Sequence, residues 1–382
     1  MNTVTLLQTP RLVIGSGCRA LCRTYLQELN LRRCYVLAPS CNVAHAQSML
    51  EGFEAVEVDS SLTAEPTVGD FTAILARAQR FQPDVVIGFG GGSALDMAKL
   101  IAALLDGSQQ IGSVFGSGFI THRTAHLVCL PTTSGTGSEV SPNAILLDES
   151  DQLKKGVVSP YLVPDAAFVD AELTLSVPPA VTAATGLDAL THCIEAYTNR
   201  FAHPAVDVWA LEGIRLIASA LEEAVRTPSS IPAREKLALG SLYGGLCLGP
   251  VNTAAVHALS YPLGGVHHIP HGHANAILLP HVMRFNQSAA PERFAAVALA
   301  LGAEPQATAE ATAEAGIDQL WKLIDATGLE MKLGALGVDA DETPQLAAAG
   351  LSVTRLMKNN PRAMTQEDAG QIYRAAFAGH SK

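Results

Sequence analysis

The amino-acid sequence predicts an α/β first half, built on a doubly wound parallel sheet, followed by an all-α second half. Two observations support this prediction. Up to about residue 176, short apolar runs alternate with helical stretches, which is typical of a parallel sheet covered by helices. From residue 178 onward, helical periodicity is interrupted by Pro and Gly, and β-branched runs are few. We therefore expect two domains, 1–176 and 177–382.

The elements of the first half follow from local patterns. Short apolar runs predict strands at 11–15, 33–38, 55–58, 84–89, 127–130 and 167–170. Helices are expected up to about residue 28, at 71–81 and at 94–105. Pro178 and Pro179 indicate the start of the first helix of the second half, and the Ala-rich stretch 307–315 is expected to be an ordinary helix.

Composition narrows the class of protein. A chain of 382 residues with 48% hydrophobic and 16% charged residues can bury large cores. The net charge of −11 argues against a nucleic-acid partner and against attraction to an anionic membrane. We see no leader segment and no apolar run long enough to span a bilayer. The seven cysteines are scattered, so we expect reduced thiols and a cytoplasmic protein.

A first glycine-rich turn follows the first expected strand. Gly15-Ser-Gly17-Cys-Arg-Ala20 fits the G-x-G-x-x-A pattern of Rossmann-like dinucleotide binding. The acidic residue that normally follows about 20 positions later is missing, because Pro39 and Ser40 stand there. A structural turn and a cofactor contact both remain open for this segment.

Two further loops favour a bound dinucleotide. Gly90, Gly91, Gly92 and Ser93 lie between an expected buried strand and a helix, where backbone N–H groups and the helix dipole can hold a pyrophosphate. A tight turn is the alternative. The loop 131–139 (PTTSGTGSE) follows another expected strand, and its hydroxyls suit ribose, phosphate or an amide, although an ordinary Ser/Thr loop with a helix cap at Ser138 would look similar.

The second half contains a candidate metal site. Asp188 and His192 stand four residues apart on an apolar helix, so both side chains share one face. This spacing alone favours a structural Asp–His pair over a metal-ligand pair. His257 and His271 lie in apolar segments separated by Pro-Leu-Gly-Gly, which we expect to form a turn that folds the second histidine towards the first. One Asp and three His suit a borderline divalent cation that acts as a Lewis acid.

Several motifs together resemble the iron-containing (group III) alcohol dehydrogenases. They are GGGSALDMAK at 90–99, PTTSGTGSEVSPNAI at 131–145, GLDALTHCIEAY at 186–197, HALSYPLGG at 257–265, PHGHANAILLPHVMRFN at 270–286 and NNPR at 359–362. The resemblance covers essentially the whole chain. It implies a dinucleotide-binding domain and a helical C-terminal domain, the architecture that dehydroquinate synthase shares.

The resemblance also implies roles for individual residues. The metal ligands would be Asp188, His192, His257 and His271. Gly90, Gly91, Gly92 and Ser93 would hold the pyrophosphate, and the rest of the cofactor would contact Thr132, Thr133, Thr136 and, at the ribose, Lys154. Asn143 would lie beside the substrate.

This sequence departs from the family pattern at two places. Many members carry a second histidine four residues after the third ligand, often assigned to proton relay, and Tyr261 stands there in this chain. His267 is a further candidate for the proton route. Members that select NAD often carry Asp at the end of the second strand, where this chain has Pro39, so the choice between NAD and NADP stays open.

The expected function is hydride transfer between NAD(P) and a primary alcohol, small hydroxy acid or aldehyde, with Fe²⁺, Zn²⁺ or another divalent ion and a homodimeric assembly. A hydroxyacid–oxoacid transhydrogenase on the same scaffold is the alternative. A lyase of the dehydroquinate synthase type is disfavoured because basic phosphate-binding residues are not evident around 257–286. A non-catalytic sensor is disfavoured because we see no tail or extra domain for a partner.

Overall fold

The computed structural model describes residues 3–63, 65–150 and 153–380. These residues divide into two compact units, which we call the α/β unit (Leu6–Ser176) and the helical unit (from Val177 onward, together with the described residues before Leu6). Within the described residues, no helix is both long enough and apolar enough to cross a membrane. None of the seven cysteines, all of which are described, forms a disulfide.

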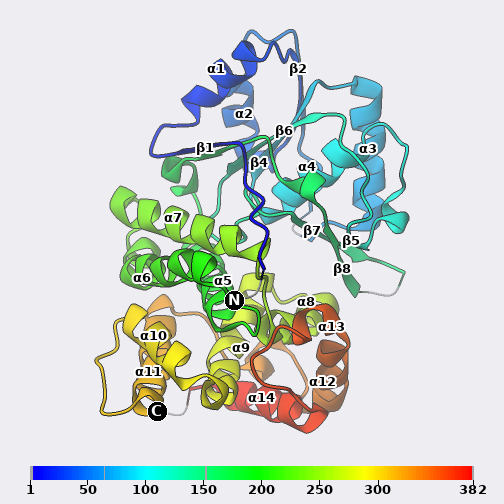
Figure 1. The fold of residues 1–382 in the computed structure, drawn as a ribbon. Coiled ribbons are helices and arrows are strands. Elements are labelled where there is room, and N and C mark those ends of the chain that lie inside the picture. The colour runs from blue at the N-terminus through cyan, green and yellow to red at the C-terminus, as the bar shows by residue number, and fades with distance from the viewer. Residues whose placement is uncertain (1–2, 64, 151–152, 381–382) are drawn as a thin grey trace. The chain divides into compact units, whose positions relative to one another are not determined.

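The α/β unit contains a six-stranded, fully parallel sheet (Figure 1). In spatial order, its strands are β1 (Arg11–Ile14), β9 (Ala166–Val169), β6 (His126–Pro131), β4 (Val85–Gly90), β2 (Arg33–Leu37) and β3 (Ala55–Asp59). The helices of this unit are α1 (Ala20–Glu28), α2 (Val43–Met49), α3 (Val68–Phe81) and α4 (Gly92–Leu104). All six strands that the sequence predicts are present, with ends within two residues of the expected ones.

Both faces of this sheet are buried, as a doubly wound fold requires. Alternate residues of β2 point to opposite sides, so that Tyr35 and Leu37 join one apolar core and Cys34 and Val36 join the other. Residues of α3 and α4 pack in the first core, and residues of α1 and α2 pack in the second. The near-continuous apolar strands seen in the sequence follow from this two-sided burial.

The strand order identifies a topological switch point between β2 and β4. The chain runs from β2 outward to β3, then returns to β4 and continues to β6 in the opposite direction. Open α/β sheets bind ligands outside the carboxyl ends of strands at such a point. The two segments at this place are the loop after β2, which begins at Ala38, and Gly90–Ser93 after β4.

A second, three-stranded sheet also belongs to the α/β unit, and the sequence analysis did not predict it. It is formed by β5 (Gly116–Ser117), β8 (Leu153–Val158) and β7 (Asn143–Asp148), with β7 and β8 antiparallel. Among the described residues no helix begins at Ser138, so the alternative of a helix cap there is wrong, and the chain enters β7 instead. β7 contains an apolar run, 144–147, that the sequence analysis did not use, whereas the two-residue β5 and the Lys-containing β8 have no strand-like pattern.

The helical unit has a single large core and contains no strand among its described residues. Its first helix begins at Pro179, as the sequence predicts, and the Ala-rich stretch lies partly in a helix that begins at Ala309. Its helices are α5 (Pro179–Thr198), α6 (Pro204–Arg226), α7 (Ile231–Leu248), α8 (Ala255–His267), α9 (His271–Asn286), α10 (Pro291–Ala300), α11 (Ala309–Thr327), α12 (Thr343–Ser352), α13 (Thr354–Met357) and α14 (Gln366–Ala378).

Candidate metal centre and cofactor loops

Helix α5 is buried almost all round, and it carries Asp188 and His192 into the core of the helical unit. Glycines on the neighbouring helices α7 and α9 allow these helices to approach α5 closely. A Cβ atom at Gly244 of α7 would lie 3.2 Å from Cβ of His192, and one at Gly272 of α9 would clash with the carbonyl group of Ala184. Small residues at these contacts therefore place α7 and α9 directly against the polar stretch of α5.

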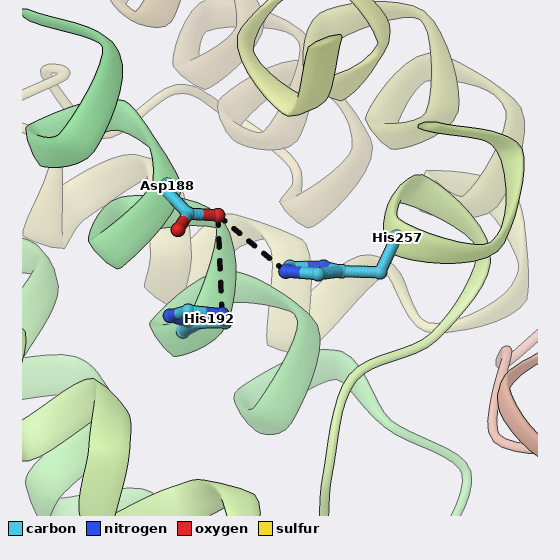
Figure 2. Close-up of side chains that lie close together, drawn as sticks. All are labelled: Asp188, His192 and His257. Carbon is cyan, nitrogen blue, oxygen red and sulfur yellow. Dashed lines mark ion pairs between the residues drawn. The ribbon is translucent and has the colours of Figure 1, made fainter. Parts of the chain in front are cut away.

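Three imidazoles converge on one carboxylate oxygen of Asp188. Oδ1 of Asp188 lies 3.9 Å from Nε2 of His192, 3.5 Å from Nε2 of His257 and 3.8 Å from Nε2 of His271. Figure 2 shows the ion pairs that join Asp188 to His192 and to His257, which come from α5 and α8. One ligand atom from each of these three residues lies within 4.8 Å of the others. The structure thus brings together the four residues that the sequence predicted as metal ligands.

The charge of Asp188 is stabilised by its neighbours. Burial alone would raise its pKa, but the imidazoles of His192, His271 and His257 hold the pKa well below its usual range. Asn275 of α9 donates a hydrogen bond from Nδ2 to Oδ1 of Asp188 at 2.7 Å, and the same nitrogen lies 3.2 Å from Nε2 of His271. The sequence analysis missed Asn275, although it stands four residues after His271 on the same helical face.

His257 lies between two carboxylates. Its Nε2 faces Asp188, and its Nδ1 lies 2.6 Å from Oε2 of Glu195, another buried residue of α5. Burial disfavours the charged imidazole, but Asp188 and Glu195 outweigh this effect and raise the pKa of His257 to about 9. The sequence analysis also missed Glu195, whose signal was a second acidic residue on an apolar helix, three positions after His192.

The donor set fits a divalent cation. One carboxylate and three imidazoles are gathered at one place, and Nε2 of His257 makes no hydrogen bond with any described residue. Ligand atoms bound to one tetrahedral cation stand about 3.4 Å apart, which is close to the separations found here. The side chain of His271 is 27% exposed, against 3–6% for the other three, so His271 is the member of the group most exposed to solvent.

The expected turn at Pro-Leu-Gly-Gly is wrong. Pro262 lies inside α8, and Gly264 and Gly265 are buried in the same helix. The reversal occurs later, at His268, which has a left-handed backbone conformation with φ of 54° and is followed by Ile269 and Pro270. Proline removes only one helical hydrogen bond, and the packing of α8 in the core compensates for it. His271 still reaches the cluster because it opens α9.

The two candidates for the proton route have different surroundings. The ring of Tyr261 lies beside that of His271, with 6.1 Å between ring centroids. Nε2 of His267 instead lies 2.9 Å from Oε2 of Glu342. The structure therefore places Tyr261 next to the candidate metal site, whereas His267 has Glu342 as its carboxylate partner.

In the α/β unit, the loops at the switch point are in contact. A Cβ atom at Gly90 would lie 2.9 Å from Cδ of Pro39, which follows β2. A Cβ atom at Gly91 would lie 3.3 Å from Oγ1 of Thr133, and one at Gly92 only 2.5 Å from Cγ2 of Thr136. Gly91 caps α4 without any side-chain hydrogen bond, so the helix N-terminus faces this group of loops through backbone alone.

A buried lysine organises the hydroxyl-rich loop. Nζ of Lys99 donates hydrogen bonds to the carbonyl oxygens of Ser138 (2.8 Å) and Asn143 (2.5 Å), and lies 3.9 Å from Oδ1 of Asp96. Oδ1 of Asp96 accepts from Ser138 Oγ, and its Oδ2 accepts from the N–H of Ile145. Both ends of the loop are therefore tied to α4, the helix that follows the glycines.

The structure also shows the surroundings of Thr132, Asn143 and Lys154, which the sequence analysis assigned to the cofactor and the substrate. Thr132 accepts a hydrogen bond from Nδ2 of Asn42 at 3.2 Å, which links the loops after β6 and β2. Asn143 is the first residue of β7, and its Oδ1 atom is buried without a described hydrogen-bond partner. Lys154 lies on β8 with Nζ 2.6 Å from Oε2 of Glu65. In this structure the lysine assigned to the ribose is thus paired with a carboxylate.

The first glycine turn is structural. The N–H groups of Gly17 and Arg19 donate to the carboxylate of Asp170 at 3.0 and 3.2 Å, and the guanidinium of Arg19 donates to the same carboxylate at 2.7 Å. Gly15 and Gly17 have φ of 141° and 77°, values that favour glycine. A protein carboxylate thus occupies N–H groups that a pyrophosphate would need, and β1 lies at the sheet edge, away from the switch point.

The carboxylate–histidine group of the helical unit and the glycine loops of the α/β unit indicate a class of protein, the metal- and dinucleotide-dependent enzymes. Comparisons with known proteins identify the family. Residues 9–171 match the family described as iron-containing alcohol dehydrogenase, and residues 182–377 match the C-terminal domain of that family. This chain belongs to the iron-containing alcohol dehydrogenases, whose chemistry is oxidation and reduction between alcohols and aldehydes.

Individual relatives agree with this assignment. The long-chain-alcohol dehydrogenase 1 of Geobacillus thermodenitrificans is 40% identical over 335 residues, which cover 86% of this chain and 84% of that protein. A crystal structure of a 1,3-propanediol oxidoreductase has a TM-score of 0.95 and 31% identity, covering 98% of this chain and 100% of the other. The sulfoacetaldehyde reductase of Bifidobacterium kashiwanohense, in complex with NAD⁺, has a TM-score of 0.90 and 28% identity, covering 99% and 100%.

Proposed function

We propose that this enzyme transfers a hydride between a nicotinamide dinucleotide and a primary alcohol, small hydroxy acid or the corresponding aldehyde, with Fe²⁺ as its native metal. The observation that carries the proposal is the convergence of His192, His257 and His271 on one oxygen of buried Asp188. The NAD⁺ complex of the similar sulfoacetaldehyde reductase supports the cofactor class. Zn²⁺ and NADP are the alternatives that the same residues would accept.

The four side chains of the cluster would hold the cation, and each has a defined contribution. A divalent cation bound there would supply Lewis acidity towards the alcohol oxygen. Asp188 supplies the negative charge, and the imidazoles supply neutral nitrogen ligands. Because His271 is the most exposed of the four, the substrate would approach from its side. Tyr261 lies on that side, and its hydroxyl is our proposed carrier of the alcohol proton, with His267 or water as alternatives.

The loops of the α/β unit would bind the cofactor, which carries the hydride. Gly91 and Gly92, which leave backbone N–H groups uncovered by any Cβ, would receive the pyrophosphate together with Gly90 and Ser93 at the start of α4. Thr132, Thr133 and Thr136 would contact the remainder of the cofactor. Lys154 would reach the ribose after leaving Glu65, and Asn143 would lie beside the substrate. A cytoplasmic homodimer is our proposal for location and assembly.

The test is a substrate screen with metal-free protein reconstituted with Fe²⁺ or Zn²⁺. Small aldehydes are offered with NADH and with NADPH, and oxidation of the free cofactor is followed. We expect turnover only after metal is added, and a higher kcat/KM with one of the two cofactors. Metal-dependent turnover that requires two organic substrates and no free cofactor would instead identify a hydroxyacid–oxoacid transhydrogenase. Equal turnover by the metal-free protein would contradict the proposal.

A further inference from the structure

The carboxylate of Glu195 receives three N–H donors from a single short stretch of chain. Its Oε2 accepts from the backbone N–H of Ala254 at 3.0 Å and lies 2.6 Å from Nδ1 of His257. Its Oε1 accepts from the backbone N–H of Val256 at 2.6 Å. The side chain of Glu195 is only 5% exposed, and a carboxylate buried to this extent is costly unless it is bonded in this way.

These contacts determine which nitrogen of His257 carries a proton when the ring is neutral. A neutral imidazole has one N–H group and one lone pair, and an ionised carboxylate can only accept. Nδ1 must therefore carry the hydrogen that bonds Glu195, which leaves the lone pair on Nε2. Nε2 is the atom that lies 3.5 Å from Oδ1 of Asp188, within the candidate metal site. The opposite tautomer would place a hydrogen where the cation would bind.

We propose that Glu195 is a positioning residue that fixes the tautomer and orientation of His257, so that Nε2 is presented to the cation with its lone pair free. The inference rests on the proposed metal-dependent function. A carboxylate bonded to the remote nitrogen of a metal-binding histidine also makes that ligand more basic. Glu195 would therefore strengthen metal binding without touching the cation.

A purely structural role for Glu195 would be to anchor the backbone before α8, and the structure allows the two roles to be separated. The same stretch of backbone is anchored by two other side chains. Nδ2 of Asn199 donates to the carbonyl of Asn252 at 3.1 Å, and Nδ2 of Asn359, in the NNPR motif, donates to the carbonyl of Thr253 at 2.7 Å. Among these three side chains, only Glu195 also bonds the imidazole of His257.

The matched pair of variants is Glu195→Gln and Asn359→Ala. Glutamine keeps the size of the side chain, but its amide has only one oxygen where the carboxylate has two. It therefore cannot accept hydrogen bonds from Val256 and from His257 at the same time. Its NH₂ group must oppose either the N–H of Val256 or Nδ1 of His257, and in the second case it favours the wrong tautomer. Alanine at 359 removes one anchor of the same backbone and leaves the contact between Glu195 and His257 in place.

The experiment measures Co²⁺ affinity by competition with a chromophoric chelator, the visible ligand-field spectrum of the Co²⁺ protein, and the Tm of the metal-free protein. We expect Glu195→Gln to lose about 10- to 100-fold in Co²⁺ affinity and to change the spectrum. Asn359→Ala should keep the wild-type spectrum and lose little affinity, even if its Tm falls. Glu195→Asp, which keeps an acceptor-only group, should retain more affinity than Glu195→Gln and covers the case in which the glutamine variant does not fold.

Wild-type affinity and spectrum in Glu195→Gln would overturn this inference and leave the proposed function intact. Equal losses of affinity in Glu195→Gln and Asn359→Ala, with an unchanged spectrum, would also overturn it, because anchoring of the backbone would then account for both. Failure of the wild-type protein to bind Co²⁺ would overturn the proposed metal site and this inference with it. The three results are distinguishable because each involves a different protein or readout.

Discussion

Nε2 of His257 lies 3.5 Å from Oδ1 of Asp188, although the two residues come from different helices, α8 and α5. Burial of this carboxylate requires compensating partners, because an unpaired carboxylate in an apolar core is strongly unfavourable. The Asp188–His192 spacing alone favours a structural pair. The approach of His257 and His271 to the same oxygen is the observation on which we base the proposed cation site.

Substitution of Gly92 by Ala should weaken cofactor binding. The added Cβ atom would lie 2.5 Å from Cγ2 of Thr136, so the glycine loop or the threonine must move, at a cost of about 1–3 kcal/mol. We expect the KM for the dinucleotide to rise about 10-fold or more, with a smaller effect on kcat. Gly112→Ala is the control, because a Cβ atom there would meet nothing within 4 Å. Unchanged KM in Gly92→Ala would contradict the assignment of this loop.

Replacement of Lys99 by Met should destabilise the α/β unit. It would leave the carboxylate of Asp96 without its positive neighbour and the carbonyl of Asn143 without its donor. Breaking a buried charged pair costs about 3–5 kcal/mol, which chemical denaturation can measure. The double variant with Asp96→Asn should recover part of the loss, since no charge is then buried alone. A double variant no more stable than Lys99→Met would show that the pair is not coupled.

Glu139 should make stability depend on pH near neutrality. It is buried, and burial raises its pKa to about 7 from an ordinary value of 4.5. Below pH 4.5 the group is protonated in both the folded and the unfolded chain and has no net effect. Between pH 4.5 and 7 the unfolded chain loses a proton that the folded chain still holds, so the folded state is progressively destabilised, by about 3 kcal/mol once the pH exceeds 7.

The variant Glu139→Gln removes this titration. We expect it to be more stable than the wild type at pH 8, with the difference in the free energy of unfolding shrinking towards pH 5. Denaturation curves at several pH values provide the measurement, with Glu51→Gln, at an exposed position, as the control. A difference that stays constant from pH 5 to pH 8 would mean that Glu139 titrates in the folded protein as it does in the unfolded chain.

Much of the fold could be predicted because its signals are local. Buried parallel strands such as β2 and β4 are short apolar runs, and their alternate residues fill two cores. The small sheet was missed because β7 and β8 are only half-buried and Lys and Gly interrupt the apolar pattern of β8, although the two strands are adjacent in the sequence and pair antiparallel. The turn before α9 was misplaced because Pro262 is tolerated inside a helix once that helix is buried.

The candidate ligands could be named from motifs, but their supporting residues could not. Asp188 and His192 share a helical face that spacing reveals, whereas the contact of Glu195 with His257 joins two helices. The first glycine turn shows that a sequence motif can also suggest a function that the structure does not support. Its pattern fits a phosphate loop, yet the decisive partner is Asp170, about 150 residues away, whose carboxylate takes the same N–H groups. Only the tertiary structure distinguishes these two uses of one sequence pattern.

The most direct test of the central claim is the metal content of Asp188→Asn after reconstitution with Fe²⁺ or Zn²⁺, measured by elemental analysis beside the wild type. Asparagine keeps the size of the side chain and removes the charge on which three imidazoles converge. Asp318→Asn, at an exposed position of α11, is the control. We predict about one metal ion per chain in the wild type and the control, and at least about 100-fold weaker binding with loss of turnover in Asp188→Asn. Full metal content and normal turnover in Asp188→Asn would contradict the account.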